Sequence, residues 1–394
     1  MTSSAERIRR YSGPAILSYG FRPLFFSAGL WALCAMGLWL LMLSGELDPP
    51  MLFGPIDWHA HELLYGYLPA AAAGFLLTAV PNWTGRLPVT GVPLAGLALC
   101  WWAGRIAVLF SAFLGAPFAA AIDLSFLVLL AAIIAREIVA GRNWRNLKVL
   151  VLIALLLIGN AVFHIEAPGG AAADGYGGRI GIAAAVFLIM LIGGRIVPSF
   201  TRNWLVRRGT GRLPAPFGTF DKAALGVSAA ALIAWGLLPG ASATLLLCLL
   251  AGVLQFVRLA RWAPERTLAE PLVWVLHLGY AFVPAGFLLV AAAGAGIGDI
   301  QRTAALHAWT AGAIGIMTLA VMTRATLGHT GRPLTATPAT TAIYGLAAVS
   351  VLARLLAGTG LAPQPLLYVA GLSWMATFAV FTLVYGPMFW RRRK

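Results

Sequence analysis

Long apolar stretches separated by short polar segments fill almost the whole of this 394-residue chain. A membrane-spanning helix needs roughly 20 consecutive apolar residues, and about twelve stretches reach or approach that length. They cover residues 24–44, 58–80, 93–114, 118–138, 147–166, 178–200, 223–238, 243–259, 272–293, 303–327, 339–356 and 366–390. The sequence therefore predicts an all-α, polytopic membrane helical bundle of about 12 transmembrane helices. Eleven or thirteen helices are the alternatives, because the seventh and eighth stretches are short.

The distribution of Lys and Arg predicts the orientation of this bundle. With twelve helices, cations at residues 7–10, 142–148, 202–222, 258–266 and 391–394 all fall on one side, whereas the opposite loops are mainly acidic. Cytoplasmic loops carry the positive excess, so both termini are expected on the cytoplasmic side of the membrane. Residues 1–22 then form a cytoplasmic segment without a cleavable signal, 391–394 a basic tail, and 1–394 a single membrane domain.

The formal charge of +15 has two alternative meanings, contact with anionic lipid or nucleic-acid binding. The cations are spread over short loops, and no soluble domain presents them, so the charge reflects topology and the lipid bilayer is the expected partner. The three cysteines, Cys34, Cys100 and Cys248, lie in different apolar stretches without C-x-x-C spacing. They are expected to be buried structural residues.

A repeat relates two of the apolar stretches. His61 and His307 are each followed five residues later by Gly, then by an apolar run, and then by Thr-Gly-Arg at 84–86 and 330–332. The second stretch ends in Val-Pro-Asn-Trp-Thr at 80–84, and the sixth ends in the similar Val-Pro-Ser-Phe-Thr at 197–201. The related stretches are therefore the second, sixth and tenth, which are four apart. Internal repeats often mark the functional interface of membrane proteins. A three-times-four arrangement is therefore predicted, although such a sequence is also a common way to end a helix.

The six histidines separate by expected depth. His59, His61, His164 and His307 lie near the outer ends of their stretches, and His277 and His329 lie near the inner side. Neutral imidazole is the commonest nitrogen ligand for copper, iron and haem. An isolated histidine at a helix end is more often an interfacial residue, but four on one side favour a metal or cofactor site. Glu62 is expected either to orient a histidine or to be a charge at headgroup level.

Arginines at the inner ends of the stretches form a second candidate set. Guanidinium groups bind carboxylates in bidentate geometry, so haem propionates would suit them. Many of these arginines serve topology alone; Arg22, Arg195 and Arg324 are the candidates for propionate binding. Arg105 and Asp123 face each other across a short turn. They are expected to form a buried ion pair with a structural role.

Several strings resemble the NnrS family over nearly the whole chain. They are Gly20-Phe21-Arg22-Pro23, Trp58-His59-Ala60-His61-Glu62, the segments 74–85 and 193–203, His277-Leu278-Gly279-Tyr280, and the segment 307–332. The resemblance implies a bacterial inner-membrane protein with twelve helices, haem and copper, linked to nitric oxide metabolism and protection from nitrosative stress. Leu63 stands where the family has Met, which is an apolar exchange.

The layout is also similar to that of the catalytic subunits of haem-copper oxidases and nitric oxide reductases. That superfamily takes its copper or non-haem iron ligands largely from spans six and seven, and neither of the corresponding stretches here contains a histidine. A binuclear centre closely similar to theirs is therefore not expected. The similarity concerns the scaffold.

These observations lead to a hypothesis for the cofactors. The bundle holds haem b, with His61 and His307 as the first-choice axial pair because the repeat relates them. His59 and His164 remain for copper or a second haem, and His277 and His329 form a separate inner site. Nitric oxide is the expected ligand, the electron donor is unknown, and whether the chain is an NO-related oxidoreductase stays open. The alternative is a transporter of an anion or metal complex.

Overall fold

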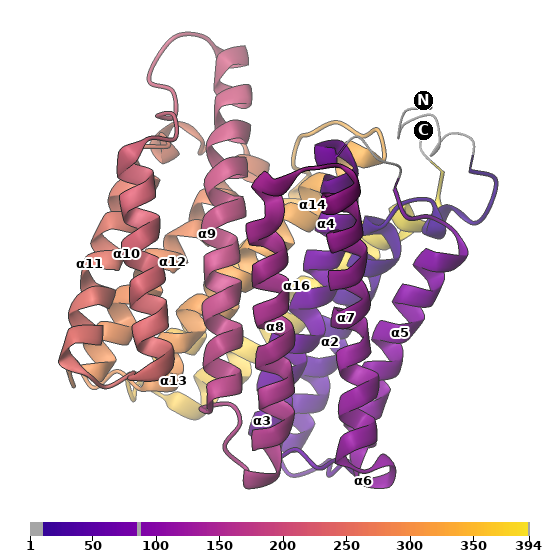
Figure 1. Cartoon of the computed structure of the whole chain (residues 1–394). Coiled ribbons are helices and arrows are strands. Elements are labelled where there is room, and N and C mark those ends of the chain that lie inside the picture. The colour runs from indigo at the N-terminus through magenta and orange to yellow at the C-terminus, as the bar shows by residue number, and fades with distance from the viewer. Residues whose placement is uncertain (1–10, 85–87, 393–394) are drawn as a thin grey trace. The chain divides into compact units, whose positions relative to one another are not determined.

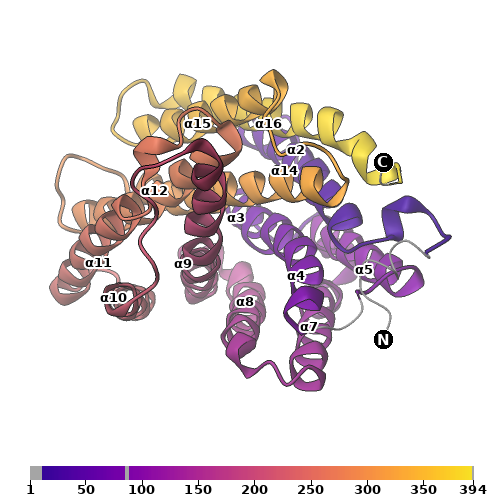
Figure 2. The same cartoon turned by 90° about the horizontal axis from the view of Figure 1, so that it is seen from above.

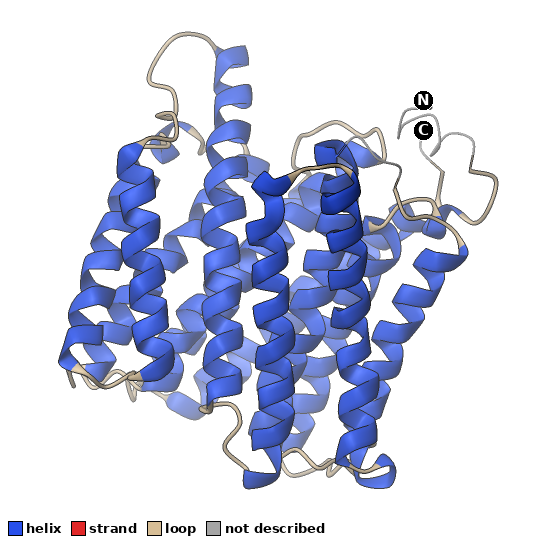
Figure 3. Ribbon diagram, viewed as in Figure 1, coloured by secondary structure: helices blue, strands red, loops and turns tan. Residues whose placement is uncertain are grey.

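The computed structural model describes residues 11–84 and 88–392, with the backbone alone at 82–84. Within that part of the chain the regular structure is entirely helical (Figure 3). Twelve helical segments there are long and apolar enough to cross a membrane. The predicted fold class and helix number are thus confirmed. Arg86 of the first Thr-Gly-Arg turn, residues 1–10 of the N-terminal segment, and Arg393 and Lys394 of the basic tail lie outside the described residues.

The helices follow the predicted stretches closely, with ends displaced by a few residues. In chain order, with short segments between them, they are α2 (Phe21–Leu43), α3 (Pro55–His61), η2 (Glu62–Tyr67), α4 (Leu68–Thr84), α5 (Val92–Leu109), α6 (Ser111–Leu114), α7 (Ala116–Ala140), α8 (Leu147–Glu166), α9 (Tyr176–Leu205), α10 (Thr219–Leu237), α11 (Ser242–Ala260), α12 (Pro271–Gly294), α13 (Arg302–His307), η7 (Ala308–Ile316), α14 (Met317–His329), α15 (Pro338–Ala357) and α16 (Pro363–Trp390).

Glycine and proline set several of these boundaries. Gly115 ends α6 with a φ of +79°, a conformation that a residue with a side chain rarely adopts. Pro117 then lies in the first turn of α7, where its missing N–H costs no hydrogen bond. The chain thereby reverses between α5 and α7, and these two helices pack against each other. This reversal places Arg105 opposite Asp123.

The chain divides into two compact units. Unit 1 comprises residues 1–184, 322–333 and 378–394, and unit 2 comprises residues 185–321 and 334–377. Helices α9, α14 and α16 each contribute residues to both units. The two units are described separately below.

In unit 1, α7 packs against α4, α5 and α8, and α2 packs against α4 (Figure 1). Arg22 near the start of α2 donates to the carbonyl of Phe389 near the end of α16, so these two helix ends meet. The opposite end of unit 1 consists of residues 44–57, 110–116 and 166–176, which we call the distal end. Its segments are tied together by hydrogen bonds from Leu52 N to Ser111 Oγ and from Ala173 N to Asp57 Oδ1.

In unit 2, α11 packs between α10 and α12, and η7 packs against α12 and α15 (Figure 2). Glycines allow the close approaches in this unit. A Cβ atom at Gly286 of α12 would lie 2.2 Å from the Trp309 ring, whose Nε1 donates to the Val283 carbonyl. The Trp309 indole thus fits against the backbone of α12 only because Gly286 has no side chain.

The two copies of the sequence repeat begin with the same local structure, and one copy begins in each unit. His61 is the last residue of α3 and is followed directly by the π-helical segment η2. His307 is the last residue of α13 and is followed directly by the π-helical segment η7. A π-segment shifts the hydrogen-bonding pattern of a helix and is frequent at functional sites. Both histidines therefore stand at the same kind of backbone irregularity.

Candidate metal centre

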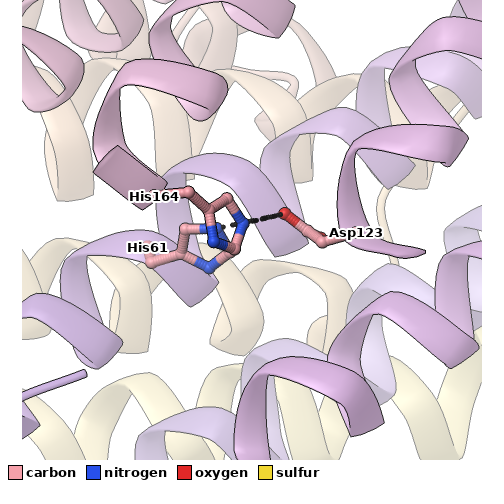
Figure 4. Close-up of side chains that lie close together, drawn as sticks. All are labelled: His61, Asp123 and His164. Carbon is pink, nitrogen blue, oxygen red and sulfur yellow. Dashed lines mark hydrogen bonds and ion pairs between the residues drawn. The ribbon is translucent and has the colours of Figure 1, made fainter. Parts of the chain in front are cut away.

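Three side chains of unit 1 converge near its distal end. His61 ends α3, Asp123 lies one to two turns into α7, and His164 lies in the last turn of α8. Their potential ligand atoms all lie within 4.8 Å of one another, and all three side chains are buried. Figure 4 shows the two imidazole rings next to each other with the Asp123 carboxylate directed at them. Two imidazoles and a carboxylate form a donor set suited to a first-row transition metal.

The His61 ring is held on both sides by oxygen atoms. Its Nδ1 lies 2.9 Å from Glu62 Oε1, and its Nε2 lies 2.9 Å from Asn160 Oδ1. The same Nε2 lies 3.2 Å from Asp123 Oδ2. A carboxylate on the nitrogen that points away from a metal is the usual arrangement for a histidine ligand, because it fixes the orientation of the ring. The expected role of Glu62 as an orienting carboxylate therefore has the required geometry.

Asp123 Oδ2 is the atom on which the cluster converges. His164 Nε2 lies 3.0 Å from this oxygen, and the Asn160 amide donates to it over 2.8 Å. Asn160 and His164 are four residues apart on α8 and so share one face of that helix. One turn of α8 therefore presents both groups to Asp123 on the neighbouring α7.

The predicted ion pair between Arg105 and Asp123 is confirmed, and it is part of a larger network. The Arg105 guanidinium binds Asp123 Oδ1 through Nη2 and Glu62 Oε2 through Nη1, the latter over 2.7 Å. Trp31 Nε1 donates to the same Glu62 oxygen over 2.8 Å. The outward oxygens of both carboxylates thus bind fixed donors, and the inward oxygens face the imidazoles. Arg105 and Trp31 thereby fix the orientation of both carboxylates relative to the two imidazole rings.

The charges and hydrogen bonds around the cluster leave room for a cation. Two carboxyl groups share one guanidinium, so with both carboxyl groups ionised and both histidines neutral, as in a metal-bound form, the network has one negative charge in excess. Five buried side-chain atoms in the described part of the chain lack a hydrogen-bond partner, and three belong to neighbouring residues here, namely Asp57 Oδ2, Trp58 Nε1 and Arg105 Nε. Buried polar groups are normally satisfied. The residues therefore fit a small bound ion with ordered water.

Four glycines make this packing sterically feasible. A Cβ atom at Gly66 would lie 2.5 Å from Arg105 Nη1, and one at Gly104 would lie 3.0 Å from Asp123 Oδ1. At Gly159 and Gly181 an added Cβ would lie 2.4 and 2.2 Å from the Tyr65 hydroxyl. That hydroxyl donates to the Gly177 carbonyl over 2.6 Å. The glycines thus let helices approach around charged and aromatic side chains.

Aromatic rings cover the side of the histidines that faces away from the charges. The Phe53 ring centroid lies 5.1 Å from that of His61 and 5.2 Å from that of His164. Phe163 lies 5.4 Å from His61 and also contacts Phe53. The centre therefore has a charged side formed by Arg105, Asp123 and Glu62 and an apolar side formed by Phe53 and Phe163.

The other predicted histidines lie elsewhere. His59 stacks on Trp39 of α2 with ring centroids 4.6 Å apart, and His329 of unit 1 contacts the Tyr19 and Phe21 rings. In unit 2, His307 Nδ1 lies 2.6 Å from the Thr303 carbonyl. His277 Nε2 lies 2.8 Å from Thr201 Oγ1, and its buried Nδ1 has no partner. Because His61 and His307 belong to different units, their axial pairing stays a prediction, as does an inner site of His277 with His329.

The arginines predicted to bind propionates have different surroundings. Arg22 is buried, and its Nη1 donates to the carbonyls of Met388, Phe389 and Arg391, which caps the end of α16. Arg195 is exposed on α9, and Arg324 is half-buried on α14. Binding of propionates by these arginines stays a prediction.

Two residues of the centre, Asp123 and Asn160, were not among the predicted ligands. Asp123 was expected to have a structural role only, and Asn160 had no role assigned. One signal was available, because Asn160 and His164 lie one helical turn apart within an apolar stretch, where polar side chains face the interior. The approach of α7 to α8 that completes the centre depends on tertiary packing.

Comparison with known proteins identifies a family. A family model described as NnrS protein matches residues 15–393, which is nearly the whole chain. No curated protein matches the chain in sequence. The match includes every residue of the centre described above.

Proposed function

The chain is a member of the NnrS family, and we propose that it is a metal-binding membrane protein of nitric oxide metabolism in which His61, His164 and Asp123 hold a copper ion. The observation that carries this proposal is the convergence of three buried ligand atoms within 4.8 Å. Ionisable side chains at membrane depth are costly and usually functional. A role in protection from nitrosative stress is the physiological part of the proposal.

The donor chemistry supports copper as the first candidate metal. Imidazole nitrogen binds copper, zinc, iron and nickel, and copper(II) forms the strongest complexes of the divalent first-row ions. Two imidazoles and one carboxylate also occur at non-haem iron sites, so iron is the second candidate. Bound copper would supply one-electron redox chemistry and a coordination position for nitric oxide. Glu62 and Asn160 orient His61, Arg105 holds both carboxylates, and the Phe53 and Phe163 rings exclude water from the apolar face.

We assign haem b, the second cofactor implied by the family, to unit 2. Both nitrogens of His61 lie against side-chain oxygens, which suits a small ion better than the axial position of a haem. The contact of His307 Nδ1 with the Thr303 carbonyl resembles the bond that fixes many histidine ligands. His277 is the alternative ligand, because its Nδ1 is buried without a partner.

The test is metal and haem analysis of the protein purified in detergent. The wild type is expected to hold one copper per chain in the cluster, and His164→Gln is expected to lose it while keeping its haem. Glutamine preserves the size and neutrality of the side chain, so the helices are expected to pack unchanged. The visible spectrum of the reduced protein, with and without nitric oxide, then reports whether the two cofactors bind the gas.

His59→Gln is the matched control, because His59 lies two residues from His61 but stacks on Trp39 outside the cluster. It is expected to retain full copper. Equal copper in the wild type and His164→Gln would contradict the assignment, and properly folded wild type without copper or haem would favour the transporter alternative. Equal loss of haem in His164→Gln would place haem in unit 1 instead.

A further inference from the structure

Asp57 has an unusual environment one turn outside the metal centre. It lies four residues before His61 on α3, so the two side chains share one helix face about 6 Å apart along the axis. Asp57 is 3% exposed. Its Oδ1 accepts from Ala173 N over 2.7 Å, whereas Oδ2 is buried and has no hydrogen-bond partner. A buried carboxylate oxygen without a partner is costly, so this oxygen is suited to receive a cation or a proton.

Phe53 covers the histidines on the same side. It lies between Pro50, whose carbonyl accepts from Ala112 N, and Pro55 at the start of α3. Its ring is 6% exposed and contacts both His61 and His164. It belongs to a loop rather than a helix. Displacement of one ring would therefore uncover both imidazoles without unfolding a helix.

The distal end around these two residues is anionic. Glu46, Asp48 and Asp174 are exposed there, and residues 44–57, 110–116 and 166–176 contain no Lys or Arg. The nearest cation along the chain is Arg179, one turn into α9, which donates to the Gly175 carbonyl and lies over the Tyr176 ring. Clefts lined by one sign of charge raise the local concentration and association rate of the counter-ion. A cation thus meets an attractive surface at this end.

We propose that metal ions reach the centre from the distal end, with Asp57 as a transient carboxylate ligand on the path and Phe53 as the gate over His61 and His164. The inference rests on the proposed metal centre and adds its route of loading. Asp57 draws the ion below the surface, and the ion passes to His61 one turn further in when the Phe53 ring moves aside. The topology predicted from the cations makes this end periplasmic, so the metal is loaded from outside the cell.

The rate of metal loading tests the route. Trp31 and Trp58 lie beside the cluster, so copper(II) quenches their fluorescence, and the phase absent in His164→Gln reports loading of the centre. In Asp57→Asn both loading and release are expected to slow about tenfold, because the transient carboxylate ligand on the path is lost. In Phe53→Ala both loading and release are expected to accelerate about tenfold as the gate is removed. The dissociation constant stays within about twofold in both, since neither residue binds the metal at equilibrium.

Matched controls separate local from general effects. Asp174→Asn removes an exposed charge from the same end, and Phe113→Ala removes a ring that is 77% exposed there. Both are expected to load within about twofold of the wild type, because Asp174 is one of three exposed acidic residues at this end and the exposed Phe113 ring does not cover the histidines. Asp57→Glu keeps the charge and is expected to restore most of the wild-type rate, which excludes a folding defect as the cause.

The outcomes distinguish this inference from the proposed function. If the wild type and His164→Gln quench identically, the metal centre itself is refuted. If the site-dependent phase exists but Asp57→Asn and Phe53→Ala leave it unchanged, the centre stands and the route is wrong. If Asp57→Asn weakens equilibrium binding at an unchanged loading rate, Asp57 is a permanent ligand, which also overturns its role as a transient one.

Discussion

Each unit buries one extended polar network, and the two networks differ in completeness. In unit 2, Arg258 donates to Asp221 Oδ1 over 3.0 Å and to the Tyr280 hydroxyl over 2.8 Å. Tyr280 donates to Gln255 over 2.7 Å, and Gln255 donates to Ser228 over 2.9 Å. The Asp221 carboxylate pairs with this guanidinium and also with that of the partly exposed Arg261, whose Nη2 lies 3.6 Å from Asp221 Oδ2. No buried side-chain atom of these six residues lacks a partner within the described part of the protein.

The network of unit 1 also contains an arginine and carboxylates, but not all of its charges and hydrogen-bonding groups are paired. Arg105 serves two carboxylates, Glu62 and Asp123, and one of its own nitrogens has no partner. A buried polar network that is fully satisfied makes a fold rigid. One that leaves atoms unsatisfied and charge unbalanced is suited to binding. The Arg258 network therefore fits a structural role, and the Arg105 network fits the proposed metal binding.

The largest expected effect comes from removing each arginine. Arg105→Met and Arg258→Met are both expected to destabilise the protein by about 3–5 kcal/mol, because each removes the buried guanidinium that pairs most closely with a buried carboxylate. Thermal unfolding in detergent measures this loss. Saturating copper is expected to recover part of the stability of Arg105→Met, since the metal replaces the missing positive charge. The same copper concentration is expected to stabilise Arg258→Met only by as much as it stabilises the wild type, because the metal centre of that variant is intact.

A second substitution checks the cause. Asp221→Asn added to Arg258→Met removes the buried charge together with its partner and is expected to recover part of the loss. Copper rescue of equal size in both single variants would show that the metal acts elsewhere. The contrast between the two networks would then have no functional meaning.

The sequence predicts the helices well because each is determined locally. An apolar stretch about 20 residues long is sufficient for a membrane helix, and the repeat around His61 and His307 was visible from identical letters at equal spacing. The π-segments that follow both histidines were not predicted. Their hydrogen-bonding shift depends on packing against neighbouring helices, such as the bond from Trp101 to the Gly66 carbonyl in η2.

The centre was only partly predictable. His61, His164 and Glu62 were found from residue type and expected depth, because polar groups at this depth are unusual. Asp123 was correctly paired with Arg105, but its approach to His164 over 3.0 Å depends on how α7 packs against α8. Asp123 and His164 are 41 residues apart in the sequence, and this separation does not indicate that their side chains are in contact. Distances between helices had to come from the structure.

Substitution of one glycine beside each arginine is expected to have a smaller effect on stability. A Cβ atom at Gly66 would lie 2.5 Å from Arg105 Nη1 and 2.9 Å from Glu62 Oε2, and one at Gly194 would lie 2.2 Å from Arg258 Nη2. Gly66→Ala and Gly194→Ala are each expected to cost about 1–3 kcal/mol, because the guanidinium must shift in a packed interior. Copper binding is expected to weaken in Gly66→Ala alone. Gly226→Ala, with open space around its Cβ position, is the control, and weakened copper binding in Gly194→Ala would contradict the separation of roles.

The smallest expected effect comes from removing one polar group from each network. Trp31→Phe removes the Nε1 donor to Glu62, and Tyr280→Phe removes the hydroxyl that donates to Gln255. Both are expected to lower stability by about 0.5–1.5 kcal/mol, the usual net contribution of a hydrogen bond. Trp31→Phe is also expected to weaken copper binding about tenfold, because Glu62 then orients His61 less firmly, and the loss of one such supporting contact typically costs 10–100-fold in metal affinity. Copper titration of both variants measures the difference. A dissociation constant that is unchanged in Trp31→Phe would mean that His61 is oriented without help from the indole, and Asn160 would then be the residue that fixes the ring.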